Sequence, residues 1–216
     1  PDFATPQHIQ DAGIAAIQQG KHGYTPSAGI PELRQAAADY FSRTRGIQVD
    51  ADDVVVGAGA KPFIGYTIQS VTDYGAGDEV IYPVPGFPIY DSQIKANGAV
   101  GVPIYLRESR NFGFDPQELA DKITPKTKLL ILNSPQNPTG GIIPKADLEA
   151  IAEILRKHPQ VWVFADEIYG QLVYNGEFNS IASLPGMQER TIISDGCSKT
   201  WAMTGWRLGF TANKKL

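Results

Sequence analysis

The sequence alternates short apolar runs with longer amphipathic segments along most of its length. Short apolar runs bounded by Gly, Pro, Asn or Asp are typical of buried strands, and amphipathic segments with a 3.6-residue period are typical of helices. We predict strands over residues 54–57, 79–82, 99–106, 128–133, 161–165, 191–194 and 207–211. Helices are expected over 31–45, 61–71, 87–96, 116–122 and 146–157. This alternation predicts an α/β fold, a three-layer sandwich with a mostly parallel seven-stranded sheet.

Local signals set some of the boundaries. Asp115 is expected to cap the helix over 116–122. Pro83 and Pro85 are expected to end the second strand, because proline has no N–H to give to a sheet. With no domain boundary visible inside it, the chain of 216 residues is long enough for one well-buried domain.

Composition excludes several classes of protein. The chain is 42% hydrophobic with a formal net charge of −4, so it is not disordered and has no overall attraction to nucleic acid or an anionic membrane. No apolar run reaches the roughly 18 to 20 residues of a membrane span. The single cysteine, Cys197, forms no internal disulfide, which favours a reducing compartment. With no signal-peptide pattern after Pro1, we predict a cytoplasmic protein.

Ligands of open parallel sheets bind beyond the carboxyl ends of the strands. The turn Gly57-Ala58-Gly59-Ala60-Lys61 follows the first strand and precedes a helix, so its N–H groups are suited to a phosphate. A plain tight turn is the alternative, because the P-loop ending is missing and Pro62 interrupts a GxGxxG pattern. The polar loop 133–141 follows the fourth strand, and its Asn137–Pro138 bond is a candidate for the cis form.

Charged residues follow the fifth and sixth strands. Asp166 follows a buried apolar run, where a carboxylate needs a cation or several donors; a helix N-cap is the alternative. Lys199 lies among small and aromatic residues, and a partly desolvated lysine is a nucleophile towards carbonyls. Arg207 is expected to open the last strand, where arginine commonly clamps a phosphate or carboxylate. The three scattered histidines disfavour a metal site or a Ser/His triad, and Cys197 is interpreted as a packing residue.

Together these features resemble the fold type I pyridoxal-phosphate (PLP) aminotransferases of class I/II, the aspartate aminotransferase-like group. The matching strings are residues 24–34, Asn137-Pro138-Thr139-Gly140, Asp166-Glu167-Ile168-Tyr169, Ser198-Lys199-Thr200 and 205–209, in the family's order and spacing. The resemblance implies a PLP-binding large domain over residues 31–216, preceded by an N-terminal segment and partner-facing loop over 1–30. It also implies a smaller C-terminal domain that carries the arginine for the substrate carboxylate. Neither this domain nor that arginine is expected within the 216 residues.

The resemblance assigns roles residue by residue. Lys199 matches the lysine that forms a Schiff base with pyridoxal 5'-phosphate and later moves the proton, and Asp166 matches the carboxylate paired with the pyridine nitrogen. Tyr169 and Asn137 match the groups that hydrogen-bond the cofactor's 3-oxygen. The other matches are Ala60, Lys61, Ser198 and Arg207 at the phosphate, Phe87 stacked on the ring, and Tyr24, which reaches the neighbouring site of a homodimer.

The implied function is a transaminase that moves an amino group between an L-amino acid and a 2-oxo acid through the Lys199 Schiff base. An opposite charge about 4 Å from the ring nitrogen is worth roughly 4 kcal/mol, about three pKa units, so Asp166 suffices to keep that nitrogen protonated. A PLP-dependent β-lyase and a non-catalytic PLP-binding regulatory domain are the alternatives. A nucleotide-binding Rossmann protein is a further alternative, disfavoured by Pro62.

Overall fold

The computed structural model describes residues 3–215 and contains a seven-stranded sheet in the order β1-β7-β6-β5-β4-β2-β3. The strands are β1 (Val54–Gly57), β2 (Glu79–Val84), β3 (Val100–Tyr105), β4 (Thr127–Asn133), β5 (Trp162–Asp166), β6 (Thr191–Gly196) and β7 (Gly209–Ala212). The pairs from β3 through β6 are parallel, whereas β7 is antiparallel to both β6 and β1. The prediction of a mostly parallel seven-stranded sheet is therefore confirmed.

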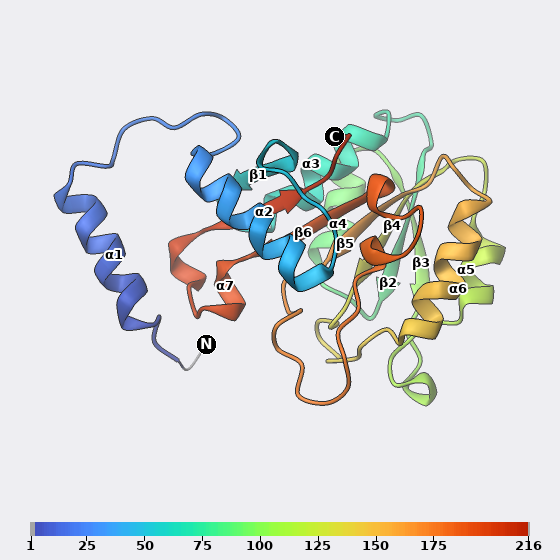
Figure 1. Ribbon diagram of the computed structural model, residues 1–216. Helices are drawn as coiled ribbons and strands as arrows, with labels where there is room; N and C mark the ends of the chain where they lie inside the picture. The colour runs from blue at the N-terminus through green and yellow to red at the C-terminus, as the bar shows by residue number, and fades with distance from the viewer. Residues whose placement is uncertain (1–2, 216) are drawn as a thin grey trace.

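Helices cover both faces of the sheet, which gives three layers (Figure 1). They are α1 (Gln7–Gln18), α2 (Pro31–Arg45), α3 (Pro62–Val71), α4 (Ile89–Ala96), α5 (Pro116–Lys122), α6 (Lys145–Arg156) and α7 (Cys197–Thr200). Alternate residues of β4 point to opposite faces: Leu130 packs with α5 and α6, and Leu129 packs with α3 and α4. Helix α2 packs on the antiparallel end of the sheet through Phe41 and Phe210. Burying each such side chain contributes about 1.5–3 kcal/mol.

Most boundaries agree with the sequence to within one or two residues. Helices α2 and α5 begin and end where predicted, and the Asp115 carboxylate accepts from the Gln117 N–H at 2.9 Å, which confirms the N-cap. The predicted cis bond at Asn137–Pro138 is present, as are cis bonds at Val84–Pro85 and Ser134–Pro135.

Three strand ends differ from the prediction by two residues: the ends of β2 and β6 and the start of β7. Strand β2 runs through Pro83 to Val84, because its pairing with β4 covers Glu79 to Ile81 and Pro83 lies beyond the stretch that is paired on both sides. Arg207 does not open β7. It follows a 3-10 turn in a left-handed conformation (φ 54°, ψ 56°), and β7 begins at Gly209.

The sequence did not predict α1, which lies to one side of the sheet and is joined to α2 by a long loop (Figure 1). Just before α1, the Thr5 hydroxyl donates to the Ala202 carbonyl at 2.7 Å, and within α1 Gly13 closely approaches the Trp206 ring. Ile14 and Ile17 remain 53% and 74% exposed, so α1 lacks the buried apolar stripe that identifies a helix in a sequence.

Candidate active site

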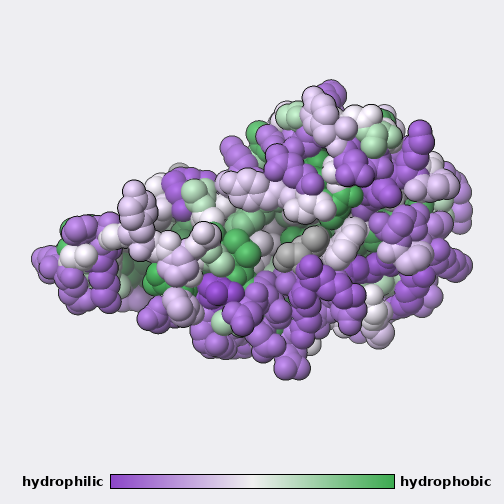
Figure 2. All heavy atoms as spheres, turned by 90° about the horizontal axis from the view of Figure 1, so that it is seen from above, coloured by the Kyte–Doolittle hydropathy of each residue, from purple (hydrophilic) through white to green (hydrophobic). Residues whose placement is uncertain are grey.

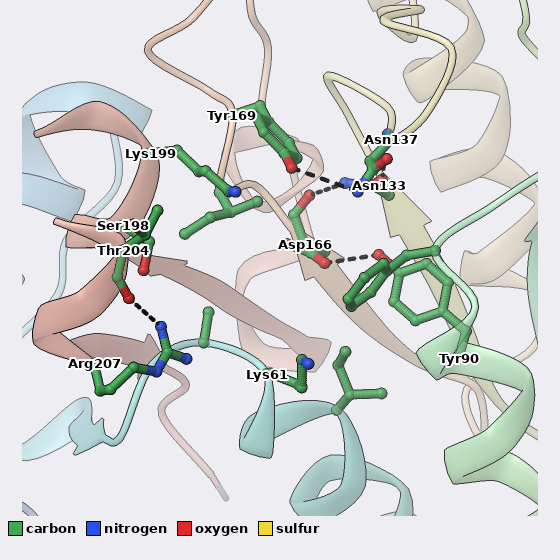
Figure 3. A pocket seen from close by; sticks show the side chains of 14 residues that line it. Lys61, Tyr90, Asn133, Asn137, Asp166, Tyr169, Ser198, Lys199, Thr204 and Arg207 are labelled. Atoms are coloured by element: carbon green, nitrogen blue, oxygen red, sulfur yellow. Dashed lines mark hydrogen bonds between the residues drawn. The ribbon is translucent and has the colours of Figure 1, made fainter. Parts of the chain in front are cut away.

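A cavity of about 430 Å³ lies at the carboxyl ends of β4, β5 and β6 (Figure 3). The residues predicted for cofactor binding and catalysis line it, except Tyr24: they are Ala60, Lys61, Phe87, Asn137, Asp166, Tyr169, Ser198, Lys199 and Arg207. Residues up to about 150 positions apart thus meet in one place. Tyr24 lies elsewhere, fully exposed in the loop between α1 and α2.

Asp166 is the last residue of β5, and its carboxylate is buried at the floor of the cavity. The Tyr90 hydroxyl donates to Oδ2 at 2.7 Å, whereas Oδ1 has no hydrogen-bond partner within residues 3–215. Burial raises the pKa of Asp166 to about 6, while Tyr90 and the Ile168 N–H lower it. A turn, not a helix, follows Asp166, so the N-cap alternative is wrong. The carboxylate keeps one oxygen for a donor or cation inside the cavity.

Lys199 extends from the short helix α7, and its amine points into the cavity between Tyr169 and Asp166 (Figure 3). Its Nζ lies 5.7 Å from the centre of the Tyr169 ring. We expected a partly desolvated lysine, but the residue is exposed, because the side chain extends into an open cavity rather than into the packed interior. A primary amine in this position is accessible to a carbonyl ligand.

Tyr169 and Asn137 form the upper side of the cavity in Figure 3. The Asn137 amide donates to the Tyr169 hydroxyl at 3.4 Å, and the Asn137 N–H donates to the side-chain oxygen of Asn133 at 2.8 Å. The Asn133 amide donates in turn to the backbone carbonyl of Asp166 at 2.9 Å. This chain of contacts fixes the polar loop after β4 against the end of β5.

The opposite side of the cavity is built from the turn after β1. Gly59 has φ +88°, and a Cβ placed there would lie 2.2 Å from Nη2 of Arg207. A Cβ on Gly209 would lie 2.3 Å from the backbone nitrogen of Ala60. Arg207 donates to the Thr204 carbonyl at 2.7 Å and to the Ala58 carbonyl at 3.4 Å. Glycine at these two positions therefore lets a guanidinium lie next to the start of α3.

Helix α3 begins at Pro62, and the side chain of its N-cap residue Lys61 makes no capping hydrogen bond. The N-terminus of a helix carries a partial positive charge and backbone donors. Together with Arg207 and Ser198, it provides the positive end of the cavity. This arrangement is suited to a phosphate dianion.

Residues 1–215 match the family model of the aminotransferases of class I and II. The chain belongs to this family. It is 42% identical over 219 residues to aspartate aminotransferase of Geobacillus stearothermophilus, an alignment that covers 100% of this chain and 54% of that protein. It is 43% identical over 216 residues to a bifunctional aspartate aminotransferase and glutamate/aspartate-prephenate aminotransferase of Petunia hybrida, covering 100% and 45%.

The fold agrees with the same family. The structure of aspartate aminotransferase from Thermus thermophilus with maleate superposes with a TM-score of 0.95 at 40% identity, covering 100% of this chain and 55% of that one. The chain thus spans about half the length of the relatives that it matches.

Members of the class I and II aminotransferase family use pyridoxal phosphate, and the cavity fits that group at each of its functional ends. Oδ1 of Asp166, which has no hydrogen-bond partner in residues 3–215, is an acceptor for a protonated ring nitrogen, and Lys199 supplies an amine for the aldehyde. Arg207 and the start of α3 suit the phosphate, and Phe87 presents an aromatic ring to the cavity. The described residues contain no group of three or more His, Cys, Asp or Glu side chains able to hold a metal ion.

Sequence reasoning missed five further residues of the aminotransferase cavity: Ile64, Tyr90, Asn133, Ile168 and Thr204. Two of them had a signal. Asn133 is a polar residue at the end of an apolar strand, and Tyr90 lies three residues after Phe87, one helical turn away, with the two rings edge to face at 5.8 Å. The apolar Ile64 and Ile168 had none, since their pattern is that of any core residue.

Proposed function

We propose that this chain forms the cofactor site of a PLP-dependent aminotransferase, which moves an amino group between an L-amino acid and a 2-oxo acid. One observation carries the proposal: a single cavity combines the exposed amine of Lys199, the cationic end at Arg207 and a carboxylate oxygen of Asp166 that has no hydrogen-bond partner within the described part of the chain. Since the chain spans about half the length of its relatives, the activity belongs to the whole protein.

In this proposal the residues of the chain divide the work. PLP, when bound, supplies an electron sink for the negative charge that develops at the substrate's α-carbon. Lys199 holds the cofactor covalently through its amine and afterwards accepts and returns the α-proton at Nζ. Asp166 holds a proton on the ring nitrogen through Oδ1. Because the pKa of Asp166 is about 6, the carboxylate is mostly ionised at neutral pH, as this role requires.

Tyr169 and Asn137 orient the cofactor by hydrogen bonds to its 3-oxygen, and Phe87 stacks on its ring. Burial and the Asp166 charge raise the pKa of Tyr169, so its hydroxyl stays protonated and can donate. Arg207, Ser198 and the N–H groups of Ala60 and Lys61 bind the phosphate.

The N-terminal segment over residues 1–30 is proposed as the partner-facing part of a homodimer, with residues 31–216 as the large domain. Tyr24 is fully exposed, and Ile14 and Ile17 are also exposed, which supports this proposal. Figure 2 shows the segment as a narrow extension at the left of the molecule. Sedimentation of the purified protein should give a dimer, and Tyr24→Ala should weaken cofactor binding only in that dimer.

A cytoplasmic location is part of the same proposal and rests on the single cysteine. Cys197 is buried, and burial raises the pKa of its thiol to about 11, which fits its interpretation as a packing residue. Among residues 3–215, no helix has both the length and the apolar character to cross a membrane. Fractionation of cells that express the protein tests the location.

The test of the cofactor site is the visible absorption spectrum of the purified protein after addition of PLP, with Lys199→Ala as control. The wild type should develop a protein-bound band that the control lacks. A band of equal strength in Lys199→Ala would show that the lysine assignment is wrong. In the full-length protein, Asp166→Ala should lower the rate by orders of magnitude while some PLP stays bound.

Product analysis tests the reaction type. Transfer of the amino group from an L-amino acid to a 2-oxo acid is the expected result. Release of ammonia and a 2-oxo acid without an acceptor would favour the β-lyase alternative, and binding of PLP without any turnover would favour the regulatory one.

A further inference from the structure

A buried ionic cluster lies behind the cavity, on the opposite side of the β5 end from Asp166. Arg45, the last residue of α2, donates through Nε to Glu167 at 2.9 Å and through Nη2 to Asp195 at 2.6 Å. The three side chains are 0%, 4% and 1% exposed, respectively. One guanidinium therefore contacts two carboxylates that come from different strand ends.

Each member of the cluster is held by further contacts. The Ser180 hydroxyl donates to Glu167 at 2.5 Å, and the Tyr40 hydroxyl donates to Asp195 at 3.0 Å. The guanidinium lies 5.1 Å from the centre of the Tyr40 ring. Although burial lowers the pKa of Arg45, the two carboxylates raise it above its ordinary value, so the side chain stays charged.

A buried ionic cluster of this kind contributes little net free energy to folding. Taking an arginine and two carboxylates out of water carries a desolvation penalty that ion pairing commonly only balances, and apolar side chains of similar volume often serve as well. The cluster also holds one positive charge against two negative ones. A role in positioning explains its presence better than a role in stability.

The cluster is covalently close to the cofactor residues. Glu167 directly follows Asp166, and since successive side chains of an extended segment point to opposite faces, fixing one fixes the other. Asp195 lies in β6, four residues before Lys199, and its own Oδ1 accepts from the Gly196 N–H at 2.7 Å, at the entry to α7. Arg45 therefore contacts both segments that carry the reactive groups.

We propose that Arg45 is a positioning residue of the cofactor site, which ties the carboxyl end of β5 to that of β6 and thereby sets Asp166 relative to Lys199. The proposal rests on the proposed function, in which these two residues hold PLP. A second, electrostatic consequence follows, because Asp195 raises the pKa of Asp166 and Arg45 offsets the charge of Asp195.

The charged and titratable groups around these carboxylates come from several elements. Asp166 faces Tyr90 of α4, Tyr169 of the following turn and Asp195 of β6, and it shares the cavity with Lys199. Asp195 faces Arg45 and Tyr40 of α2 and Cys197 of α7, and Glu167 faces Arg45, Ser180 and Asp195. Arg45 is the cation that contacts Glu167 and Asp195 within the described residues.

The first experiment measures the pKa of the Asp166 carboxyl by carbon NMR in the cofactor-free protein. Arg45→Met leaves Asp195 without its cation, so this pKa should rise by at least about half a unit, and Asp195→Asn should lower it by a similar amount. Loosened packing alone does not produce shifts of opposite sign. Arg43→Met, at an exposed position of the same helix turn, is the matched control and should leave the pKa unchanged.

The second experiment measures PLP affinity and covalent attachment to Lys199 by absorbance. Arg45→Met should bind PLP at least about tenfold more weakly than the wild type. Arg45→Lys keeps the charge but replaces a fork that spans two carboxylates by a single ammonium, so it should keep the Asp166 pKa and recover only part of the affinity.

The outcomes separate the two proposals. If the wild type does not capture PLP, the proposed function fails, and the Asp166 pKa still tests the effect of the cluster. If Arg45→Met folds, binds PLP as the wild type does and leaves the Asp166 pKa unmoved, the positioning role is overturned. Should Arg45→Met not fold, Asp195→Asn decides: a lowered Asp166 pKa supports the proposal, and an unchanged one overturns it.

Discussion

Asp166 and Glu167 are neighbours at the end of β5, and both carboxylates are buried, yet their surroundings differ completely. Glu167, on the back, has an ion pair with Arg45 and a hydrogen bond from Ser180. Asp166, on the cavity side, accepts from the Tyr90 hydroxyl through Oδ2, and its Oδ1 has no hydrogen-bond partner among the residues that the structure describes. The chain provides the counter-charge of the back carboxylate and leaves that of the front one to a ligand.

Burial raises the pKa of both carboxyls, but the consequences differ. At the back, the ion pair with Arg45 opposes the effect of burial on Glu167. At the front, a buried carboxylate without a cation destabilises the fold, and a cationic ligand that pairs with it removes that cost. A carboxyl with a perturbed pKa that faces a cavity indicates a functional site. A carboxyl behind the cavity that is paired with a cation instead indicates a residue that positions the site.

The largest effect on the free energy of unfolding is expected for the carboxylates at the back. Arg45→Met leaves two buried carboxylates without a cation and should destabilise the protein by about 3–5 kcal/mol. Urea unfolding of the cofactor-free protein at neutral pH measures the difference, with Arg43→Met as control. A loss below about 1 kcal/mol would mean that the back carboxylates do not depend on Arg45.

The Asp166 substitution at the front should change the free energy of unfolding in the opposite direction. Because the pKa of Asp166 is raised in the fold to about 6 from 3.8, its contribution to stability is fully present below about pH 4 and is lost as the pH rises through 6. The loss amounts to about 3 kcal/mol. Asp166→Asn should therefore stabilise the cofactor-free protein at pH 8 relative to the wild type, with little difference at pH 4. Unfolding at both pH values checks this, with the exposed Asp121→Asn as control.

A smaller and more local effect is expected at the phosphate end. Gly59→Ala strains a residue with φ +88° and displaces Arg207, which should cost about 1–3 kcal/mol and weaken PLP binding at least about tenfold. Gly176→Ala is the matched control, since Gly176 has φ +84° but open space around its Cβ position. It should be strained without losing PLP affinity. Equal affinities in the two variants would argue against a phosphate site at Arg207.

The smallest effect tests the hydroxyl donor of the front carboxylate, Tyr90. Tyr90→Phe removes the hydrogen bond to Oδ2, so the pKa of Asp166 should rise above about 6 and the protein should lose about 1 kcal/mol at neutral pH. NMR titration of the Asp166 carboxyl measures the shift. Tyr66→Phe, an exposed tyrosine of α3, should change neither quantity.

Much of this molecule was predictable from local patterns. The seven strands, the helices over 31–45 and 116–122 and the Asp115 cap follow from apolar periodicity and turn chemistry, which act over a few residues. The residues assigned to the cofactor were matched through the family resemblance that these short strings carry, and all but Tyr24 line one cavity. Arg207 was placed in a strand, whereas the structure has it in a left-handed turn with its side chain donating to the carbonyl of the distant Ala58.

The sequence by itself determined which segments become strands and helices, because hydrophobic periodicity and caps are properties of neighbouring residues. Only the tertiary structure decided which carboxylates have a cation. The pairing of Arg45 with Glu167 and Asp195 spans 122 and 150 positions, and the contact of Tyr90 with Asp166 spans 76. Such partners are set by the order of the strands in the sheet. That order places one carboxylate against a guanidinium and leaves its neighbour facing the cavity.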